Sequence, residues 1–130
     1  TGTSIGGIIA LALAYEIPAE EIAKIFDNKG QEIFKKQSWI GIFKAKYNSA
    51  ILKSILVDWF DDALIGDLKH PVVIPAVDYT TGFPVTFKTA HHDTFKRDWK
   101  QKIVDVALAT SAAPTYFKRH RIGENEYIDG

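Results

Sequence analysis

The sequence contains no cysteine and no methionine. Without cysteine there is neither a disulfide framework nor a thiolate metal site, which suits a reducing compartment. Neither charge sign is in excess, because 16 Lys and Arg balance 16 Asp and Glu, so we expect no nucleic-acid partner. The longest apolar run, 5–15, includes two glycines and is shorter than the roughly 20 residues that a bilayer-spanning helix needs. The composition is that of an ordinary globular domain.

The two ends of the chain have the character of positions inside a longer protein. The first residues, 1–4, form a turn-like stretch with no initiator methionine. The last two residues, Asp129 and Gly130, would open a loop. We therefore expect an internal fragment of about one domain, truncated at both ends.

Four stretches have helical periodicity. Residues 5–15 are apolar on every face, which predicts a buried helix. A second helix is expected to begin at Pro18 and to be interrupted at Gly30, before Ile33 and Phe34. A third, amphipathic helix is expected to begin at a capping residue, Asn48 or Ser49. Residues 99–109 predict the fourth helix.

Three stretches predict strands. Residues 72–77 form a continuous apolar run, typical of a strand covered on both faces, in which Pro75 favours a bulge or an edge. Residues 83–87 alternate apolar and polar side chains, and a short strand at 127–128 leads into Asp129. Helices alternating with such strands predict an α/β layered fold, with a mixed, largely parallel sheet between helices.

The segment from Gly2 to Gly7 fits the pattern G-x-S-x-G. In such a nucleophile elbow the serine, here Ser4, projects from a tight turn between a strand and a helix. The residues two before and two after it approach each other, so both Gly2 and Gly6 are expected to exclude a larger side chain. The helix beginning at Ile5 would direct free N–H groups at an oxyanion. The alternative is a glycine turn in which the serine only caps the helix.

A serine nucleophile needs a base to accept its proton, and histidine is the usual one. His70 precedes a proline and is interpreted as a surface loop residue. His91 and His92 lie in a polar loop that offers no third ligand for a metal ion. His120 lies among basic residues and is interpreted as part of a basic surface loop. We therefore expect no metal site and no cofactor.

An aspartate that is shielded from water can replace histidine as the base. Asp129 is the candidate, because it follows a short apolar strand and precedes Gly130. An ordinary turn aspartate is the alternative. Ser111 is a second serine to consider, but it lacks flanking glycines, so we expect its hydroxyl to close backbone groups at a helix end.

Three separated segments resemble the patatin-like phospholipase family, and in particular its soluble bacterial members. They are the elbow at 2–7, the segment Ala-Thr-Ser-Ala-Ala-Pro-Thr-Tyr-Phe at 109–117, and the pair Asp129-Gly130. Residues 74–89 also resemble the middle strands of the family. The resemblance covers the chain, so residues 1–130 are expected to form a partial patatin-like phospholipase domain, from the nucleophile elbow to the Asp-Gly pair.

The resemblance implies a Ser–Asp dyad with no catalytic histidine, in a lipid acyl hydrolase of phospholipase A type. Ser4 would form an acyl-enzyme with a lipid ester, and Asp129 would carry the proton. The amide of Ile5 is the one oxyanion donor that this chain offers. Two alternatives stay open. One is an α/β-hydrolase esterase whose triad histidine lies beyond Gly130, and the other is a catalytically inactive domain that binds a lipid or a partner.

Some bacterial members of the family are effectors that cyclic nucleotides switch on in anti-phage defence, and the middle of this chain resembles that branch. A cyclic nucleotide activator would bind outside this chain. The segment 33–57 contains five lysines and no acidic residue, with Trp39 and Phe43 between them. Lys35–Tyr47 is a candidate contact for anionic lipid headgroups. A solvated basic loop with its aromatic side chains in the core is the alternative. The expected location is cytoplasmic, with peripheral contact at the inner membrane surface.

Overall fold

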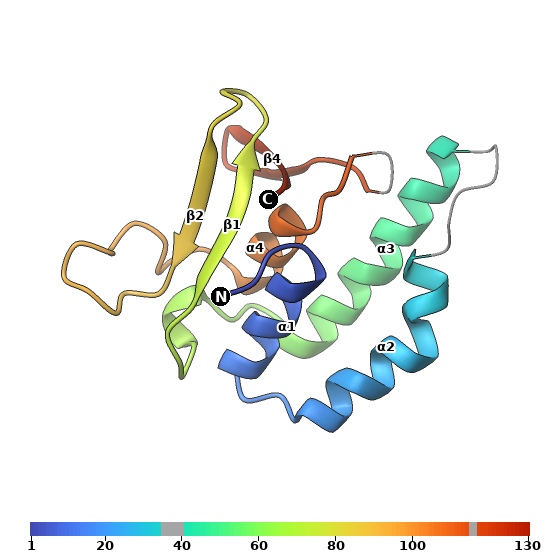
Figure 1. Cartoon of the computed structure of the whole chain (residues 1–130), viewed down its shortest axis with the longest axis horizontal. Coiled ribbons are helices and arrows are strands. Elements are labelled where there is room, and N and C mark those ends of the chain that lie inside the picture. The colour runs from blue at the N-terminus through green and yellow to red at the C-terminus, as the bar shows by residue number, and fades with distance from the viewer. Residues whose placement is uncertain (35–40, 115–116) are drawn as a thin grey trace.

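A computed structural model of the chain describes residues 1–34, 41–114 and 117–130, and of these the side chains of 29–34 and 41–48 lie outside the description. Helices and strands alternate along it as expected of an α/β protein (Figure 1). The elements are α1 (Ile5–Ala14), α2 (Ala19–Phe34), α3 (Gly41–Phe60), the short 3-10 helix η1 (Ile65–Asp67), β1 (Val73–Asp78), β2 (Pro84–Lys88), α4 (Ile103–Thr110), β3 (His120–Ile122) and β4 (Asn125–Asp129).

The strands form a sheet in the order β2-β1-β4-β3, and every pair of neighbours is antiparallel. The expectation of a largely parallel sheet is therefore wrong. Parallel neighbours need a crossover connection, whereas β1 and β2 follow each other through a short turn, as do β3 and β4. The pairing of β1 with β4 brings the end of the chain to the middle of the sheet, beside Ala76.

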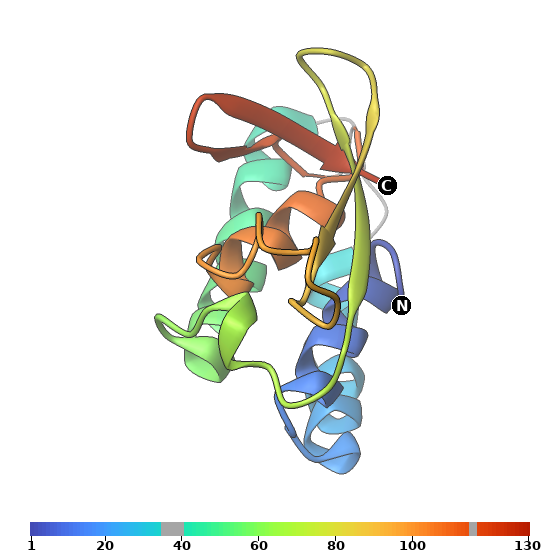
Figure 2. The same ribbon diagram turned by 90° about the vertical axis from the view of Figure 1, so that its left-hand side faces the viewer.

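Only one face of β1 is fully covered within the described part of the chain. Ile74, Ala76 and Asp78 are buried, and Val73 and Val77, which point the other way, are partly exposed. Figure 2 shows the helices on one side of β1 and β2. The sequence-based expectation of a strand covered on both faces is thus wrong for the described residues. Residues 72–77 are apolar throughout, so the sequence does not reveal that buried and partly exposed positions alternate along β1.

Pro75 lies where β1 is paired on one side only. It stands opposite Thr86 of β2, whereas pairing with β4 begins one residue later, at Ala76. The predicted edge position of this proline is confirmed. Its carbonyl group is consequently available to a partner from outside the sheet.

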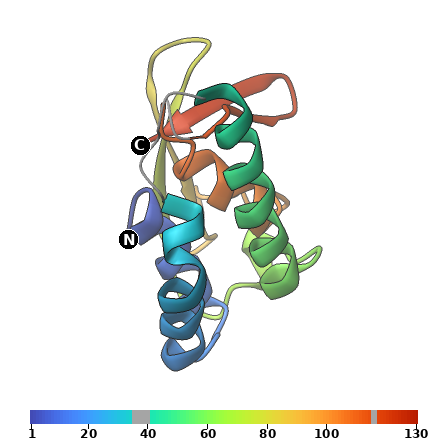
Figure 3. The same cartoon turned by 90° about the vertical axis from the view of Figure 1, so that its right-hand side faces the viewer.

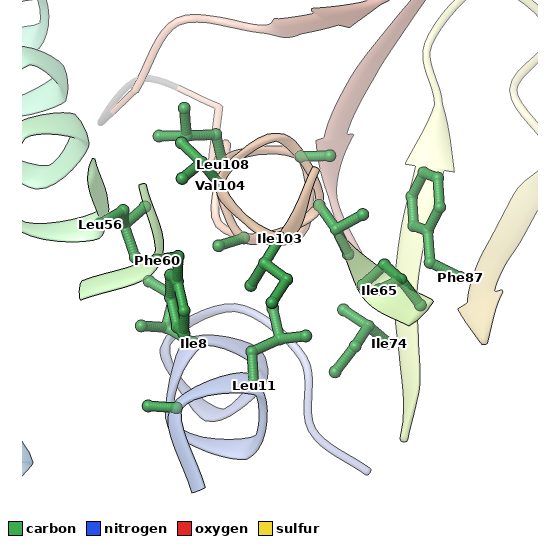
Figure 4. Packing of buried hydrophobic residues seen from close by; sticks show 14 of the residues in the cluster. Ile8, Leu11, Leu56, Phe60, Ile65, Ile74, Phe87, Ile103, Val104 and Leu108 are labelled. Carbon is green, nitrogen blue, oxygen red and sulfur yellow. The ribbon is translucent and has the colours of Figure 1, made fainter. Parts of the chain in front are cut away.

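The core lies between the sheet, α1, α3 and α4, as Figure 4 shows in a view along α4. The prediction that α1 is buried is confirmed for the side that carries Ile8, Leu11 and Ala12. Burial on every face is wrong for the described residues, because Ile5 is 37% exposed and Leu13 is 47% exposed. None of the helices within the described residues combines the length and the apolar character that crossing a bilayer requires. Large side chains that are almost completely buried are Ile8, Leu11, Leu56, Phe60, Ile65, Ile74, Ile103 and Val106.

Two helix boundaries differ from those expected. α2 continues through Gly30, because a glycine in a helix costs only about 1 kcal/mol relative to alanine. α3 begins at Gly41 rather than at Asn48 or Ser49, which lie inside the helix. Figure 3 shows α2 and α3 side by side along the face of the molecule. The capping residue types therefore predicted the start of a helix at two positions that lie in the interior of α3.

α4 begins at Ile103, four residues later than the periodicity suggested. The residues before it instead bond to the connection that leads out of α3. The N–H of Ile65 donates to the carbonyl of Gln101 at 2.8 Å, and the N–H of Gly66 donates to the carbonyl of Trp99 at 3.0 Å. These bonds fix the start of α4, which decides where its C-terminal end meets the sheet.

Candidate active site

Ser4 occupies the turn that opens α1, with φ 54° and ψ −130°. A positive φ is uncommon for a residue with a side chain and marks local backbone strain. The carbonyl of Ser4 accepts the N–H groups of Gly7 at 3.0 Å and Ile8 at 3.2 Å, so the helix starts directly after the serine. The geometry is that of a nucleophile elbow.

The glycines around Ser4 differ in whether the structure leaves room for a larger side chain. A Cβ atom on Gly2 would overlap the backbone carbonyl group of Gly6. A Cβ atom on Gly6 would meet nothing within 4 Å, so the expectation that this position excludes a side chain is wrong. The second tight position is Gly7, where a Cβ atom would lie 2.7 Å from Cγ2 of Thr110. The close approach in the elbow therefore involves the backbone of Gly6, and its Cα hydrogens face open space.

Both ends of the chain lie beside β1 (Figures 1 and 2). There the hydroxyl of Ser4 donates a hydrogen bond of 2.5 Å to Oδ2 of Asp129, and both residues are partly buried. Asp129 is the last residue of β4 and pairs with Ala76. Gly130 follows so close to β1 that a Cβ atom on it would lie 2.7 Å from the carbonyl carbon of Pro75. The structure thus brings together the serine and the aspartate that the sequence singled out.

Thr110, at the end of α4, is a site residue to which sequence reasoning gave no role. Its hydroxyl oxygen accepts the N–H of Ser4 at 3.2 Å, and the same hydroxyl donates to the carbonyl of Pro75 at 2.6 Å. The side chain is completely buried. The one available signal was its place in the segment 109–117 that carries the family resemblance; within that segment, Thr115 and Tyr116 lie outside the described residues.

The first turn of α1 supplies candidate donors for an oxyanion. Among the described residues, no group accepts a hydrogen bond from the N–H of Ile5 or of Gly6. Unpaired N–H groups at the start of a helix, together with the positive end of its dipole, favour negative charge. The N–H of Ser4 itself is engaged by Thr110.

All four histidines of the chain fall within the described residues, and each pairs with a side chain other than Ser4. The ring of His120 lies 2.9 Å from a carboxylate oxygen of Asp105. This histidine is partly buried in β3, so its expected place in a surface loop is wrong. The partners of the others are Glu16 for His70, Thr89 for His91 and Thr94 for His92.

Ser111 has the structural role expected of it. Its side chain is buried, and its hydroxyl donates to the carbonyl of Ala107 at 2.7 Å, which closes the last turn of α4. Across residues 1–34, 41–114 and 117–130, no group of three or more His, Asp or Glu side chains is arranged to hold a metal ion.

The predicted lipid contact falls mostly outside the described part of the chain. Residues 35–40 are not described, and for Gly41–Tyr47 the structure gives the backbone, as the first turns of α3, and no side chains. Lys53, farther along α3, is exposed. The basic surface therefore remains a prediction.

A serine on a strained turn before a helix is typical of α/β hydrolytic enzymes with a serine nucleophile. In this chain the group within hydrogen-bond reach of the serine hydroxyl is a carboxylate. The chain belongs to the patatin-like phospholipase family, whose model matches residues 1–130.

Three bacterial relatives carry the name cGAMP-activated phospholipase. The protein of Pseudomonas aeruginosa is 47% identical, over 99% of this chain and 40% of the relative. That of Vibrio cholerae is 42% identical, over 92% of this chain and 37% of the relative. That of Escherichia coli is 44% identical, over 92% of this chain and 35% of the relative. The chain thus spans at most 40% of the length of these relatives.

Proposed function

We propose that this chain is the catalytic part of a lipid acyl hydrolase of phospholipase A type, with Ser4 as nucleophile and Asp129 as general base. The observation that carries the proposal is the 2.5 Å hydrogen bond between the Ser4 hydroxyl and Oδ2 of Asp129. A base within hydrogen-bond reach of the nucleophile is the first requirement for proton transfer. Membership of a phospholipase family supports the choice of a lipid ester as substrate.

The geometry suits an acyl-enzyme mechanism. Ser4 Oγ attacks the ester carbonyl carbon while its proton moves to the Asp129 carboxylate along the existing hydrogen bond. The N–H of Ile5 and the positive end of α1 stabilise the oxyanion that forms. Collapse breaks the ester C–O bond, and the proton passes from Asp129 to the departing alkoxide. A water molecule then attacks the carbonyl carbon of the acyl-enzyme while one of its protons moves to Asp129. Collapse breaks the bond between Ser4 Oγ and the acyl carbon, the proton returns from Asp129 to Ser4, and the fatty acid is released.

A cavity of about 550 Å³ adjoins the end of β4, and its wall combines apolar side chains with the ion pair of Arg119 and Glu126, which suits a lipid substrate. Its wall includes Ala112, whose carbonyl accepts the N–H of Asp129 at 3.1 Å. The guanidinium of Arg119 lies over the ring of Tyr79, 3.7 Å from its centroid, so cationic and apolar groups share the wall. The lining residues are Tyr79, Ala112, Pro114, Phe117, Lys118, Arg119, Glu126 and Ile128.

The decisive experiment is labelling of the purified protein with a fluorophosphonate probe, combined with hydrolysis of a short-chain aryl ester. We expect the probe to react with Ser4 and the Ser4→Ala variant to lose both labelling and hydrolysis. Absence of labelling in the wild-type protein would instead favour a binding domain without catalysis. Labelling that survives Asp129→Asn would favour the esterase with a histidine base.

We further propose that the hydrolase is activated by a cyclic nucleotide that binds outside this chain, as an effector of anti-phage defence. The names of the three bacterial relatives support activation by a cyclic nucleotide, and the role in anti-phage defence rests on the family resemblance. We expect cGAMP to raise phospholipid hydrolysis by the full-length protein that contains this chain. A rate that cGAMP leaves unchanged, in a preparation that hydrolyses the aryl ester, would contradict the activation and leave the hydrolase proposal intact.

A further inference from the structure

The C-terminal end of α4 holds the backbone of both residues of the proposed dyad. The hydroxyl oxygen of Thr110 accepts the N–H of Ser4 at 3.2 Å. Two residues later, the carbonyl of Ala112 accepts the N–H of Asp129 at 3.1 Å. One short segment therefore fixes two residues that the sequence separates by 125 positions.

The roles of the Thr110 hydroxyl are fixed by its chemistry. A hydroxyl group has one proton to donate, and a carbonyl can only accept, so that proton goes to the Pro75 carbonyl at 2.6 Å. A backbone N–H can only donate, so the oxygen lone pair of Thr110 receives the N–H of Ser4. The hydroxyl therefore links β1 to the elbow, one residue before β1 begins to pair with β4.

The methyl group of Thr110 packs against the elbow. It occupies the space beside Gly7, where an added Cβ atom would lie 2.7 Å from Cγ2. Since the whole side chain is buried, neither substituent is free to turn away. Thr110 thus contacts the elbow at two places, the N–H of Ser4 and the backbone of Gly7.

We propose that Thr110 is a positioning residue that holds Ser4 in its strained conformation and in line with Asp129. A positive φ persists only when the surroundings over-determine it, and the hydrogen bond to the Ser4 N–H supplies such a constraint. The same bond keeps that N–H away from the oxyanion and leaves the role of donor to Ile5. This inference rests on the proposed function, since it assigns Thr110 a part in that reaction.

The test compares Thr110→Val, which keeps the shape and loses the hydroxyl, with Thr110→Ser, which keeps the hydroxyl. Thr89→Val is the matched control, because Thr89 is also buried and its hydroxyl accepts the N–H of Val72 at 3.0 Å, next to β1. The readouts are kcat and KM on a soluble aryl ester, the rate of fluorophosphonate labelling, and the melting temperature.

We expect Thr110→Val to lower kcat and the labelling rate about 10²-fold with little change in KM, since a small misplacement of a reacting group costs about that much. Thr110→Ser, which keeps the hydroxyl, should retain most of the wild-type kcat. Thr89→Val should lower the melting temperature to a similar extent and leave kcat near that of the wild type. A merely structural role for Thr110 predicts instead that both valine variants behave alike.

The positioning role is overturned if folded Thr110→Val keeps wild-type kcat, or if Thr110→Ser loses as much as Thr110→Val. Should Thr110→Val fail to fold, Thr110→Ala removes the hydroxyl without adding bulk, and the same comparison with Thr110→Ser decides. Equal rates of hydrolysis by the wild type and Ser4→Ala would contradict the proposed function, and the proposed role of Thr110 would fail with it. Loss of activity in Ser4→Ala but not in Thr110→Val would sink the positioning role alone.

Discussion

The Ser4 hydroxyl donates a 2.5 Å hydrogen bond to Oδ2 of Asp129, although the two residues stand 125 positions apart in the sequence. Ser4 lies in the elbow before α1, and Asp129 pairs with Ala76 of β1. The end of α4 accepts the backbone N–H of both residues, so the contact depends on how α1, α4 and the sheet are placed relative to one another.

Replacing Asp129 by Asn should lower hydrolysis of a soluble ester by about 10²–10⁴-fold, because a general base contributes about that much to the rate. Asp105→Asn is the matched control, since this carboxylate lies 2.9 Å from His120 rather than beside Ser4. It should leave the rate nearly unchanged. A large loss in Asp105→Asn with little effect of Asp129→Asn would show that the His120–Asp105 pair, and not Asp129, serves the nucleophile.

Alanine at Gly7 and alanine at Gly6 should have opposite effects on the free energy of unfolding. Gly7→Ala places a methyl group 2.7 Å from Thr110 Cγ2 and should destabilise by about 1–3 kcal/mol, the usual effect of overpacking. Gly6→Ala meets open space and should stabilise α1 by roughly 0.5–1 kcal/mol, the advantage of alanine over glycine in a helix. Chemical denaturation of the two variants measures both. Equal destabilisation would mean that the space beside Gly6 is filled.

The local parts of the site could be predicted from the sequence. The pattern around Ser4 predicts its own turn and helix, and Asp129 follows the short apolar strand predicted at 127–128. Local sequence alone left Asp129 open to the interpretation of an ordinary turn aspartate, and the family resemblance singled it out. The contact between Ser4 and Asp129 is a tertiary property that neither local pattern contains.

The remaining features depend on contacts between distant segments. The partner of Gly7 is Thr110, and the sequence holds no sign of which helix end meets the elbow. Whether neighbouring strands are parallel or antiparallel likewise depends on which strands become neighbours, and β1 pairs with β4 although residues 79–124 lie between them. β3 was missed because a three-residue strand of charged and apolar residues has too little periodicity to detect.

The ion pair that joins Asp62 to Lys102, the residue before α4, should be visible in the titration of Asp62. The two charged atoms lie 2.6 Å apart. The hydrogen bond from Lys102 and its positive charge lower the pKa of the Asp62 carboxyl, and Asp62 raises the pKa of Lys102. In Lys102→Gln the pKa of Asp62 should rise towards its ordinary value, as measured by NMR of the side-chain carboxyl carbon.

The sign of the pH effect follows from these directions. The contribution of Asp62 to stability is present above its unfolded pKa, about 3.9, and is lost as the pH falls through the lower folded value. The contribution of Lys102 is present below about 10.4 and is lost as the pH rises through its higher folded value. Because both side chains are well exposed, added salt should weaken the shift. An Asp62 titration that Lys102→Gln leaves unchanged would contradict this assignment.

The basic segment around α3 should determine binding to anionic membranes rather than chemistry. Lys53 is exposed on α3, and Lys35, Lys36, Lys44 and Lys46 precede it in the sequence. A lysine near an anionic bilayer contributes about 1 kcal/mol to binding, so a lysine-to-glutamate change should weaken binding to phosphatidylglycerol vesicles by about tenfold. Turnover of a soluble aryl ester should not change.

Lys96→Glu is the matched control for this experiment. Lys96 is exposed in the loop between β2 and α4, at the opposite end of the molecule from the start of α3 (Figure 1). The control carries the same charge reversal, so a nonspecific effect of net charge would weaken both variants equally. Vesicle sedimentation that shows a loss for the α3 variants alone supports a docking surface there. Binding that is unchanged in the α3 variants would mean that another face meets the lipid.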